Sequence, residues 1–183
     1  MSKIDSAVLD EAGSVTDKLV DLHTQLAATD PERQSLAYYG LLEFASLGSS
    51  EAMYLVARCL MTGRGVEPNL HAGHKWLEHA VAAAVPSRAA CYALGQLHLH
   101  FKIEYSNPEY GIGLLAKALE LAHSEALPEL LRLCDSSIYE LKARKATYRA
   151  LGTLAAAPDA DKAAIDEFQL FCRAFKSSEL LDS

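Results

Sequence analysis

Apolar residues recur along this chain at the three- and four-residue spacing of amphipathic helices, whereas the alternating apolar and polar runs of strands are nearly absent. Alanine and leucine, both strong helix formers, dominate the apolar positions. The pattern predicts a first helix over residues 6–28. Asp30 is then expected to cap a second helix, because its side chain can accept a backbone N–H, and Pro31 suits the first turn of that helix.

The helical pattern contains an internal repeat. Segments of similar sequence begin at Ala52, Ala90 and Ala126, which are 38 and 36 residues apart. Each segment is predicted to form one helix, called helix A of its repeat. A second helix, helix B, follows in the first two repeats, where Trp76 aligns with Leu114 at the same spacing of 38 residues. Because both helices agree on one period, the sequence predicts stacked antiparallel hairpins, an all-α solenoid.

The repeat divides a single predicted domain, residues 1–183, into consecutive segments. These are N-terminal helices with a partial repeat (1–51), repeat one (52–86), repeat two (87–123), a divergent repeat three (124–157) and a capping helix with a tail (158–183). The third helix B is expected over 138–157 and the capping helix over 163–175.

Small residues and glycines are expected to shape the hairpins. Ala57, Ala80, Gly95 and Ala118 are predicted to let helix backbones approach closely. Gly63 and Gly65 are predicted to end helix A of repeat one, since glycine tolerates a positive φ, and Pro68 to restart the chain toward helix B. Trp76 is expected to fill the space between hairpins.

The charge of the chain limits its partners. Its 183 residues carry a net charge of −7, from 17 basic and 24 acidic residues. Nucleic-acid-binding proteins usually present a basic stripe, and the one basic cluster, in residues 142–149, is interpreted as a solvated helix face. The acidic balance disfavours anionic membrane surfaces, and no apolar run reaches the ~18 residues of a membrane span. We therefore expect neither nucleic acid nor a membrane as a partner.

No arrangement of residues predicts catalysis, a cofactor or a metal site. Hydrolase, zinc-protease and phosphate-loop motifs do not occur, and Gly63-Arg64-Gly65 is interpreted as a turn. Zinc needs three or four ligands, whereas histidines such as His71 and His74 place at most two on one helical turn, where we expect them at the surface beside a loop. Cys91 and His98 are seven residues apart, about 10 Å along a helix, which is too far for a nucleophile–base pair. We predict a non-enzymatic protein.

The four cysteines are Cys59, Cys91, Cys134 and Cys172. Each lies in an apolar helical context without a paired spacing, so we interpret them as reduced, buried thiols; two disulfides are the alternative that an even count leaves open. The N-terminal residues lack the apolar stretch of a signal peptide. We expect a cytoplasmic location.

The first repeat resembles a known family. Ala52, Val56, Ala57, Leu60, Gly63, Gly65, Val66, Trp76 and Ala80 follow the pattern of the Sel-one-like repeats, which are relatives of tetratricopeptide repeats. Repeat two keeps Ala90, Leu94, Gly95 and Ala118 but lacks the loop glycines. The resemblance implies a right-handed superhelix in which helices A line a concave groove, and proteins that act as adaptors, scaffolds or chaperone-like binders. Many secreted relatives pair cysteines within a hairpin; helix B of repeat one has none to pair with Cys59, which supports a cytosolic location.

The helical-repeat register indicates which residues face the groove. The candidate binding residues are Tyr54, Arg58 and Met61 in repeat one, Tyr92, Gln96, Leu99 and His100 in repeat two, and Arg132 in repeat three. Tyrosine and arginine are enriched at binding hot spots, and methionine adapts to varied surfaces. The alternative is that some of these side chains only pack against neighbouring hairpins.

The leading functional hypothesis is a bacterial cytosolic adaptor that binds a peptide or protein in the groove. One alternative is a chaperone or immunity-type partner of a secreted protein, for which a basic partner would be expected. The other is a regulatory enzyme subunit or weak hydrolase. A stoichiometric partner would support binding, whereas turnover without a partner would support an enzyme.

Overall fold

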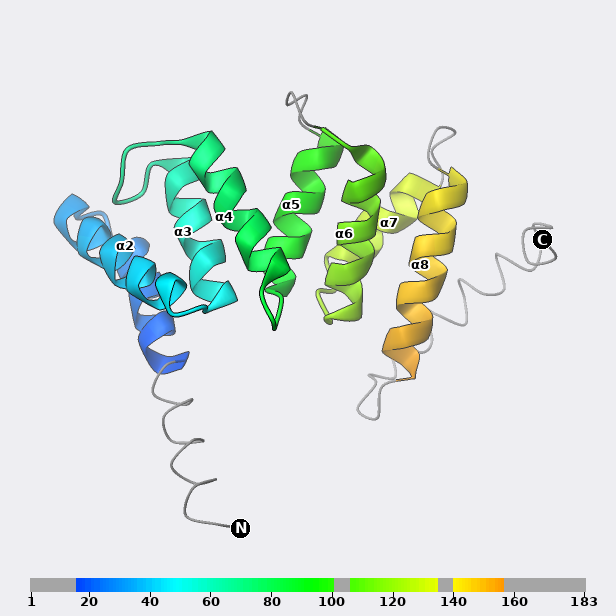
Figure 1. Cartoon of the computed structure of the whole chain (residues 1–183), viewed down its shortest axis with the longest axis horizontal. Helices are drawn as coiled ribbons and strands as arrows, with labels where there is room; N and C mark the ends of the chain where they lie inside the picture. The colour runs from blue at the N-terminus through cyan, green and yellow to red at the C-terminus, as the bar shows by residue number, and fades with distance from the viewer. Residues whose placement is uncertain (1–15, 101–105, 135–139, 157–183) are drawn as a thin grey trace, which may run out of the picture. The chain divides into compact units, whose positions relative to one another are not determined.

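The computed structural model describes residues 16–100, 106–134 and 140–156. Within these ranges every regular element is an α-helix and no strand occurs (Figure 1). The all-α prediction and the helical hairpins of the repeats are confirmed. Of the predicted first helix, residues 16–26 are described and helical, whereas the predicted capping helix at 163–175 lies outside the described residues.

The chain divides into two compact units, residues 1–90 and 91–183. The first unit contains the helix at 16–26, α2 (Pro31–Ser46), α3 (Ser50–Thr62) and α4 (Leu70–Ala82). The boundary falls inside α5 (Arg88–His100), and the second unit continues with α6 (Pro108–Glu120), α7 (Ala126–Cys134) and α8 (Glu140–Ala155). A single solenoid domain with a right-handed superhelix stays a prediction.

Side-chain caps start the helices at the 38-residue period of the repeat. Ser49 and Ser87 precede helices A of the first two repeats, and each hydroxyl oxygen accepts the backbone N–H three residues later, at 3.3 and 3.2 Å. Asn69 and Asn107 cap the two helices B in the same way, at 2.9 and 3.1 Å. Such caps satisfy N–H groups that lack partners within the helix. Asn69, rather than the predicted Pro68, is therefore the residue that starts α4.

The predicted turn residues at the ends of α2 and α3 are confirmed. Asp30 accepts the N–H of Glu32 at 3.0 Å, and Pro31 occupies the first turn of α2. Gly63 ends α3 with a φ of 72°, and Gly65 follows with a φ of 73°. A Cβ at position 65 would lie 2.2 Å from the backbone oxygen of Gln34, so the loop after α3 packs directly against the start of α2.

Close backbone contacts join helices A and B within the first two hairpins. A Cβ added at Gly73 of α4 would lie 3.1 Å from the backbone oxygen of Ala57 in α3. A Cβ added at Gly111 of α6 would lie 3.0 Å from the backbone oxygen of Gly95 in α5. The prediction of close approach holds for Ala57 and Gly95, but Gly73 and Gly111, which stand at the contacts on helices B, are not among the predicted residues.

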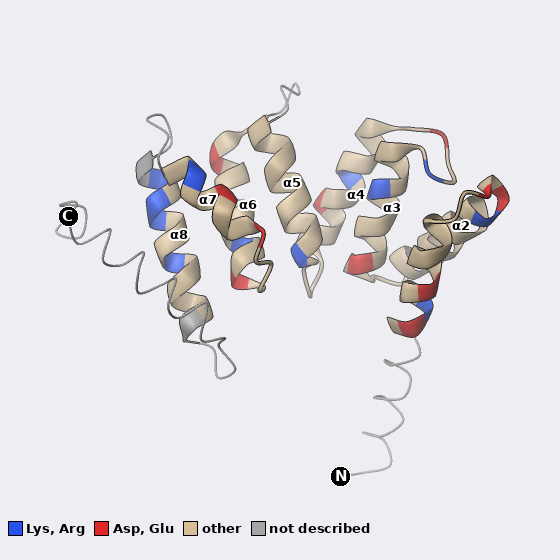
Figure 2. Ribbon diagram, turned by 180° about the vertical axis from the view of Figure 1, so that it is seen from behind, with Lys and Arg blue, Asp and Glu red and all other residues tan. Residues whose placement is uncertain are grey.

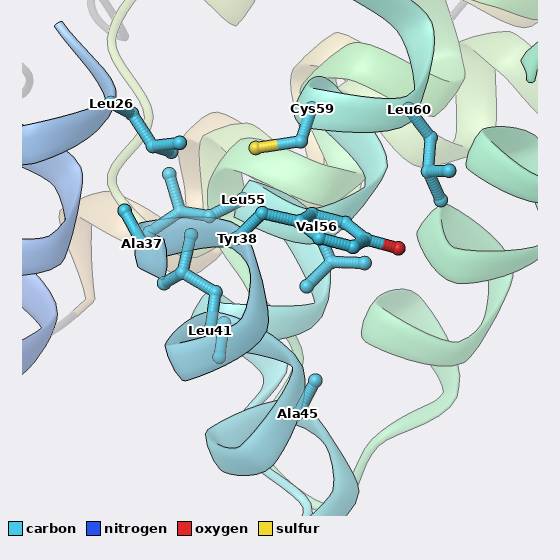
Figure 3. Packing of buried hydrophobic residues seen from close by; sticks show 10 residues of the cluster. Leu26, Ala37, Tyr38, Leu41, Ala45, Leu55, Val56, Cys59 and Leu60 are labelled. Atoms are coloured by element: carbon cyan, nitrogen blue, oxygen red, sulfur yellow. The ribbon is translucent and has the colours of Figure 1, made fainter. Parts of the chain in front are cut away.

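The core of the first unit lies between the helix at 16–26, α2 and α3 (Figure 3). Its buried side chains are Leu26, Ala37, Tyr38, Leu41, Ala45, Ala52, Leu55, Val56, Cys59 and Leu60. Burial of each large aliphatic side chain contributes roughly 1.5–3 kcal/mol to folding. Trp76 of α4 packs against this core but is only half-buried, so the predicted filling of the space between hairpins is partial.

In the second unit α7 and α8 form the third hairpin, with α6 packed on both. Leu115 and Leu119 of α6, Leu130 of α7 and Leu151 of α8 are almost completely buried. Thr147 is the buried polar residue of α8, and its hydroxyl donates to the carbonyl oxygen of Ala143 at 2.8 Å. The predicted helix B over 138–157 is confirmed within the described residues 140–155.

Candidate functional site

One face of α3 combines a fixed backbone with accessible side chains. Tyr54, Arg58 and Met61 are half-buried, whereas Leu55 and Cys59, which directly follow Tyr54 and Arg58, are part of the core. The first three residues, called the α3 face, are the predicted binding residues of repeat one. Because α3 is held rigidly by its buried face, their backbone positions are fixed before any partner arrives.

Aromatic and cationic contacts order the α3 face. The guanidinium carbon of Arg58 lies 5.7 Å from the centroid of the Tyr54 ring, within cation–π range. Arg58 Nη1 also lies 3.5 Å from Nε2 of His23, on the helix at 16–26. Met61 lies against Gly73, where an added Cβ would meet its Cγ at 2.8 Å, so Met61 also packs its own hairpin. Tyr54 and Arg58 are therefore the residues of this face that are available to a partner.

A small hollow opens beside Arg58 in the first unit. It is lined by His23, Leu26, Leu55, Arg58, Cys59, Thr62 and Arg64. Leu26, Leu55 and Cys59 are buried and form apolar walls, whereas Arg64 is exposed and belongs to the loop after α3. Burial raises the pKa of the Cys59 thiol to about 11, outweighing the opposite influence of nearby Arg58 and Arg64. The thiol in this hollow is therefore protonated and a poor nucleophile at neutral pH.

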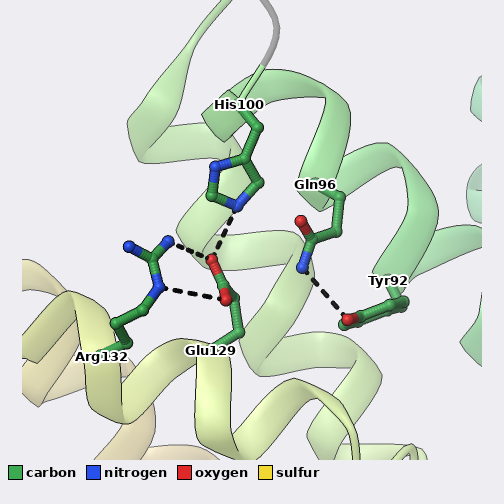
Figure 4. A network of polar contacts seen from close by, with 5 residues as sticks. All are labelled: Tyr92, Gln96, His100, Glu129 and Arg132. Atoms are coloured by element: carbon green, nitrogen blue, oxygen red, sulfur yellow. Dashed lines mark hydrogen bonds and ion pairs between the residues drawn. The ribbon is translucent and has the colours of Figure 1, made fainter.

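The corresponding face of α5 lies in the second unit and contains Tyr92, Gln96, Leu99 and His100, called the α5 face. The Gln96 amide donates to the Tyr92 hydroxyl at 3.1 Å (Figure 4). The Tyr92 ring stacks on His123, with centroids 4.7 Å apart and an interplanar angle of 15°. Tyr92 is therefore held at its hydroxyl by the Gln96 amide and on its ring face by the His123 imidazole.

Glu129 of α7 connects the α5 face to repeat three. Its Oε1 lies 2.7 Å from Nε2 of His100 and 2.6 Å from Nη2 of Arg132, while Arg132 Nε donates to the other oxygen at 3.3 Å (Figure 4). Hydrogen bonds from Arg132, with a smaller contribution from His100, outweigh desolvation and lower the pKa of the Glu129 carboxyl. The carboxylate is therefore ionised at neutral pH and neutralises Arg132 within the chain.

The structure joins two of the predicted residues, His100 and Arg132, through Glu129, which the sequence analysis missed, and it pairs two others, Tyr92 and Gln96, with each other. The signal for Glu129 was its i, i+3 spacing to Arg132, which favours an ion pair on a helix. Leu99 is half-buried, and a Cβ at Gly111 would meet its Cγ at 3.0 Å, so it packs toward α6. That the α3 and α5 faces line one groove stays a prediction.

Other candidate groups are accounted for by packing. His74 is 6% exposed rather than at the surface, and burial lowers its pKa, which favours the neutral imidazole. His98 is also buried and accepts the N–H of Asn107 at 3.1 Å, which ties the turn before α6 to α5. Among the residues that the structure describes, no three metal-ligating side chains gather.

The predicted basic cluster lies along α8 (Figure 2). Lys145 and Arg149 are exposed, and Lys142 forms an ion pair with Glu109 of α6. The interpretation as a solvated helix face holds for Lys145 and Arg149, whereas Arg144 of the same cluster is half-buried. In the described part of the chain, no helix is both long and apolar enough to span a membrane.

Comparison with known proteins agrees with the repeats seen in the structure. The family model of the Sel1 repeat matches residues 50–84 and 88–123, which are the α3–α4 and α5–α6 hairpins. No curated protein matches the chain. The matched ranges confirm repeats one and two, and Sel1 repeats commonly act as protein–protein interaction modules.

Proposed function

We propose that this protein, a member of the Sel1-like repeat family through its hairpins at residues 50–84 and 88–123, is a non-catalytic module that binds a peptide or protein partner. The binding residues are those of the α3 face, with Tyr54 and Arg58 at its centre, and those of the α5 face. Within this function, the specific role that we propose is that of a cytosolic adaptor.

One observation carries the proposal: Tyr54 and Arg58 are accessible and already ordered. Arg58 contacts the Tyr54 ring at 5.7 Å and His23 at 3.5 Å, on a helix whose other face is fully packed. Ordering side chains on binding costs roughly 0.5–1.5 kcal/mol per side chain. Contacts that fix Tyr54 and Arg58 in the free protein reduce that cost, and tyrosine and arginine are the residue types that most often dominate binding energies.

The α5 face supports the same conclusion independently. Tyr92 is held by Gln96 and His123, and His100 by Glu129. These side chains are half-buried or exposed, so their ordering is not a consequence of core packing. A surface whose polar side chains are fixed by one another suits recognition of one defined partner.

The described thiols support a non-catalytic role and a reducing compartment. Cys59 and Cys91 are free thiols, and both are buried, as is Cys134. Burial raises the pKa of the Cys91 thiol, as it does that of Cys59, so the thiolate needed for catalysis is disfavoured at both positions. Free thiols are typical of cytosolic proteins, whereas secreted domains commonly pair their cysteines.

The test is capture of a partner by the full chain from its native cells, followed by calorimetric titration of variants. Tyr54→Ala and Tyr92→Ala should each weaken the partner by more than ~1 kcal/mol. Circular dichroism should remain close to that of the unmodified chain. Tyr54 also packs against the core of the first unit, so Tyr54→Ala should lower the unfolding temperature, and the titrations are run well below it.

Lys145→Ala, on the exposed side of α8, is the control for a surface change outside both faces. Loss of binding in this variant, with Tyr54→Ala and Tyr92→Ala unaffected, would place the binding surface on α8 and refute the proposal. Catalytic turnover by the isolated chain would refute the non-catalytic role.

A further inference from the structure

We propose that the hollow beside α3, with Arg58 and Arg64 at its rim and Leu26, Leu55 and Cys59 as its walls, is a binding site for a carboxylate group of the partner. This inference rests on the proposed function, because Arg58 belongs to the α3 face. It adds a chemical class to that function: the partner presents a carboxylate, from an acidic side chain or from its chain end.

The hollow concentrates positive charge on an acidic chain. The chain as a whole carries a net charge of −7, yet Arg58, Arg64 and His23 converge on one hollow. Among the described residues, no carboxylate lies within 4.0 Å of either guanidinium. Arginine forms planar, bidentate hydrogen bonds to carboxylates. It binds an external carboxylate most strongly where no carboxylate of its own chain competes for the guanidinium.

Arg58 of repeat one has a counterpart in repeat three. Arg58 and Arg132 occupy the same repeat position, six residues after Ala52 and Ala126. Three residues before Arg132 stands Glu129, which binds it at 2.6 Å. Three residues before Arg58 stands Leu55, a wall of the hollow. Repeat three therefore supplies its own carboxylate to this arginine, whereas repeat one offers the arginine with an apolar surface beside it.

The loop after α3 fixes the backbone of Arg64, which carries the second guanidinium. Arg64 lies between Gly63 and Gly65, whose φ values are 72° and 73°. Its backbone N–H donates to the carbonyl oxygen of Cys59 at 3.2 Å, and the close approach of Gly65 to Gln34 ties the loop to α2. The backbone of Arg64 is therefore held at the hollow from both sides.

The other groups that line the hollow determine which kind of anion it can bind. The Thr62 hydroxyl donates to the carbonyl oxygen of Arg58 at 2.8 Å, so the donors left for an anion come from the guanidiniums. Nε2 of His23, 3.5 Å from Arg58 Nη1, is placed to orient that guanidinium. The buried, apolar Leu26, Leu55 and Cys59 suit the methylene groups that carry a carboxylate better than they suit a fully hydrated ion.

The probes are three alanine-based pentapeptides: one with a central glutamate and blocked ends, its glutamine counterpart, and an all-alanine peptide with a free C-terminal carboxylate. Each is titrated into the full chain while NMR follows the side-chain N–H resonances of Arg58 and Arg64. We expect saturable shifts with a carboxylate peptide and none with the glutamine peptide. The glutamate and chain-end peptides show which source of carboxylate the hollow accepts.

The variants test the site. Arg58→Gln and Arg64→Gln should each weaken carboxylate binding by about tenfold, as expected when a charge-assisted hydrogen bond is lost. Arg58→Lys, which keeps the charge but loses the planar fork, should fall between. The matched control is Arg88→Gln, an exposed arginine at the start of α5 that does not line the hollow. Equal shifts with the glutamine peptide, or equal weakening by Arg88→Gln, would overturn the inference.

The proposed binding faces and the carboxylate site can be refuted independently of each other. If no carboxylate peptide shifts the arginine resonances, but Tyr54→Ala still weakens the captured partner, the carboxylate site is wrong and the binding module stands. If the glutamate peptide binds at Arg58 and Arg64, but Tyr54→Ala and Tyr92→Ala leave the captured partner unaffected, the carboxylate site stands and the proposed binding faces are wrong.

Discussion

Glu129 binds Arg132 through both carboxylate oxygens, at 2.6 and 3.3 Å, and the same carboxylate contacts His100 at 2.7 Å. The side chain of Glu129 is 16% exposed, whereas that of Arg132 is 60% exposed. The mostly buried carboxylate of Glu129 thus holds two more exposed side chains, those of His100 and Arg132. Arg132 was predicted as a binding residue because of its repeat position, and this relationship shows that its charge is already balanced within the chain.

The first prediction concerns Glu129→Gln. Since hydrogen bonds from Arg132 hold the folded-state pKa of Glu129 below 4.5, the carboxylate stabilises the fold above pH 4.5, and this contribution is lost as the pH falls through the folded-state pKa. Arg132 is largely exposed, so the variant should lose no more than ~1 kcal/mol at pH 7. Urea unfolding at pH 7 and at pH 3 should show the difference between the two proteins shrinking in acid.

The control is Glu125→Gln, which changes an exposed carboxylate before the start of α7. It should leave the unfolding free energy nearly unchanged at both pH values. A Glu129→Gln protein that is as stable as the unmodified chain at pH 7 would show that the network makes no net contribution.

The second prediction compares two glycines of α6. A Cβ at Gly111 would lie 3.0 Å from the backbone oxygen of Gly95 and from Leu99 Cγ, whereas a Cβ at Gly113 would meet nothing within 4 Å. Gly111→Ala should therefore cost roughly 1–3 kcal/mol, because the α5–α6 hairpin must open. Gly113→Ala should stabilise by about 0.5–1 kcal/mol, because alanine favours the helix. Thermal unfolding of both variants measures the difference, and equal effects would contradict the close packing of this hairpin.

Much of the fold was predictable because its local signals recur with the repeat. Asp30 and Pro31 start α2 by chemistry that involves only neighbouring residues, and the same is true of Gly63 at the end of α3. The caps Asn69 and Asn107, which are 38 residues apart, are local signals of the same kind and would have corrected the expectation that Pro68 restarts the chain.

The candidate site was less predictable, since it depends on contacts between distant segments. His100 and Glu129 are 29 residues apart, and Arg58 and His23 are 35 apart, so no helical spacing indicates either contact. The register selected half-buried positions such as Tyr54 and Tyr92, but it also selected Met61 and Leu99, which pack within their own hairpins, and it did not indicate which side chains contact one another. The hollow requires Arg64, a loop residue whose position follows from the approach of Gly65 to Gln34.

The third prediction concerns the thiols, tested in a Cys172→Ser variant so that the signal reports the described cysteines. Cys59, Cys91 and Cys134 are buried, and burial raises the pKa of Cys59 to about 11. At pH 8 they should react with a thiol-specific disulfide reagent only as fast as the fold opens, because the reactive thiolate is both scarce and inaccessible. Reductant should leave the melting temperature unchanged.

Guanidinium-unfolded protein provides the control for this measurement, since all three thiols should then react at once. Immediate reaction of the native protein would contradict burial of the thiols. A melting temperature lowered by several degrees in reductant would indicate a stabilising disulfide, which contributes ~2–4 kcal/mol in typical proteins.

The last prediction concerns Trp76, the single tryptophan of the chain. Its ring packs against the core of the first unit and lies 5.9 Å from the ring of His79, edge to face, but it remains half-buried. Full burial would make Trp76→Ala cost ~3–5 kcal/mol; with part of the ring in water, we expect about 2–3 kcal/mol. Leu70→Ala, on the same helix but 70% exposed, is the control and should change stability by less than ~0.5 kcal/mol. Tryptophan emission of the native chain should be blue-shifted from that of the unfolded chain yet still quenched by acrylamide, because one side of the ring is accessible. Native emission equal to that of the unfolded chain would place the ring in water and contradict the packing of α4 on the first unit's core.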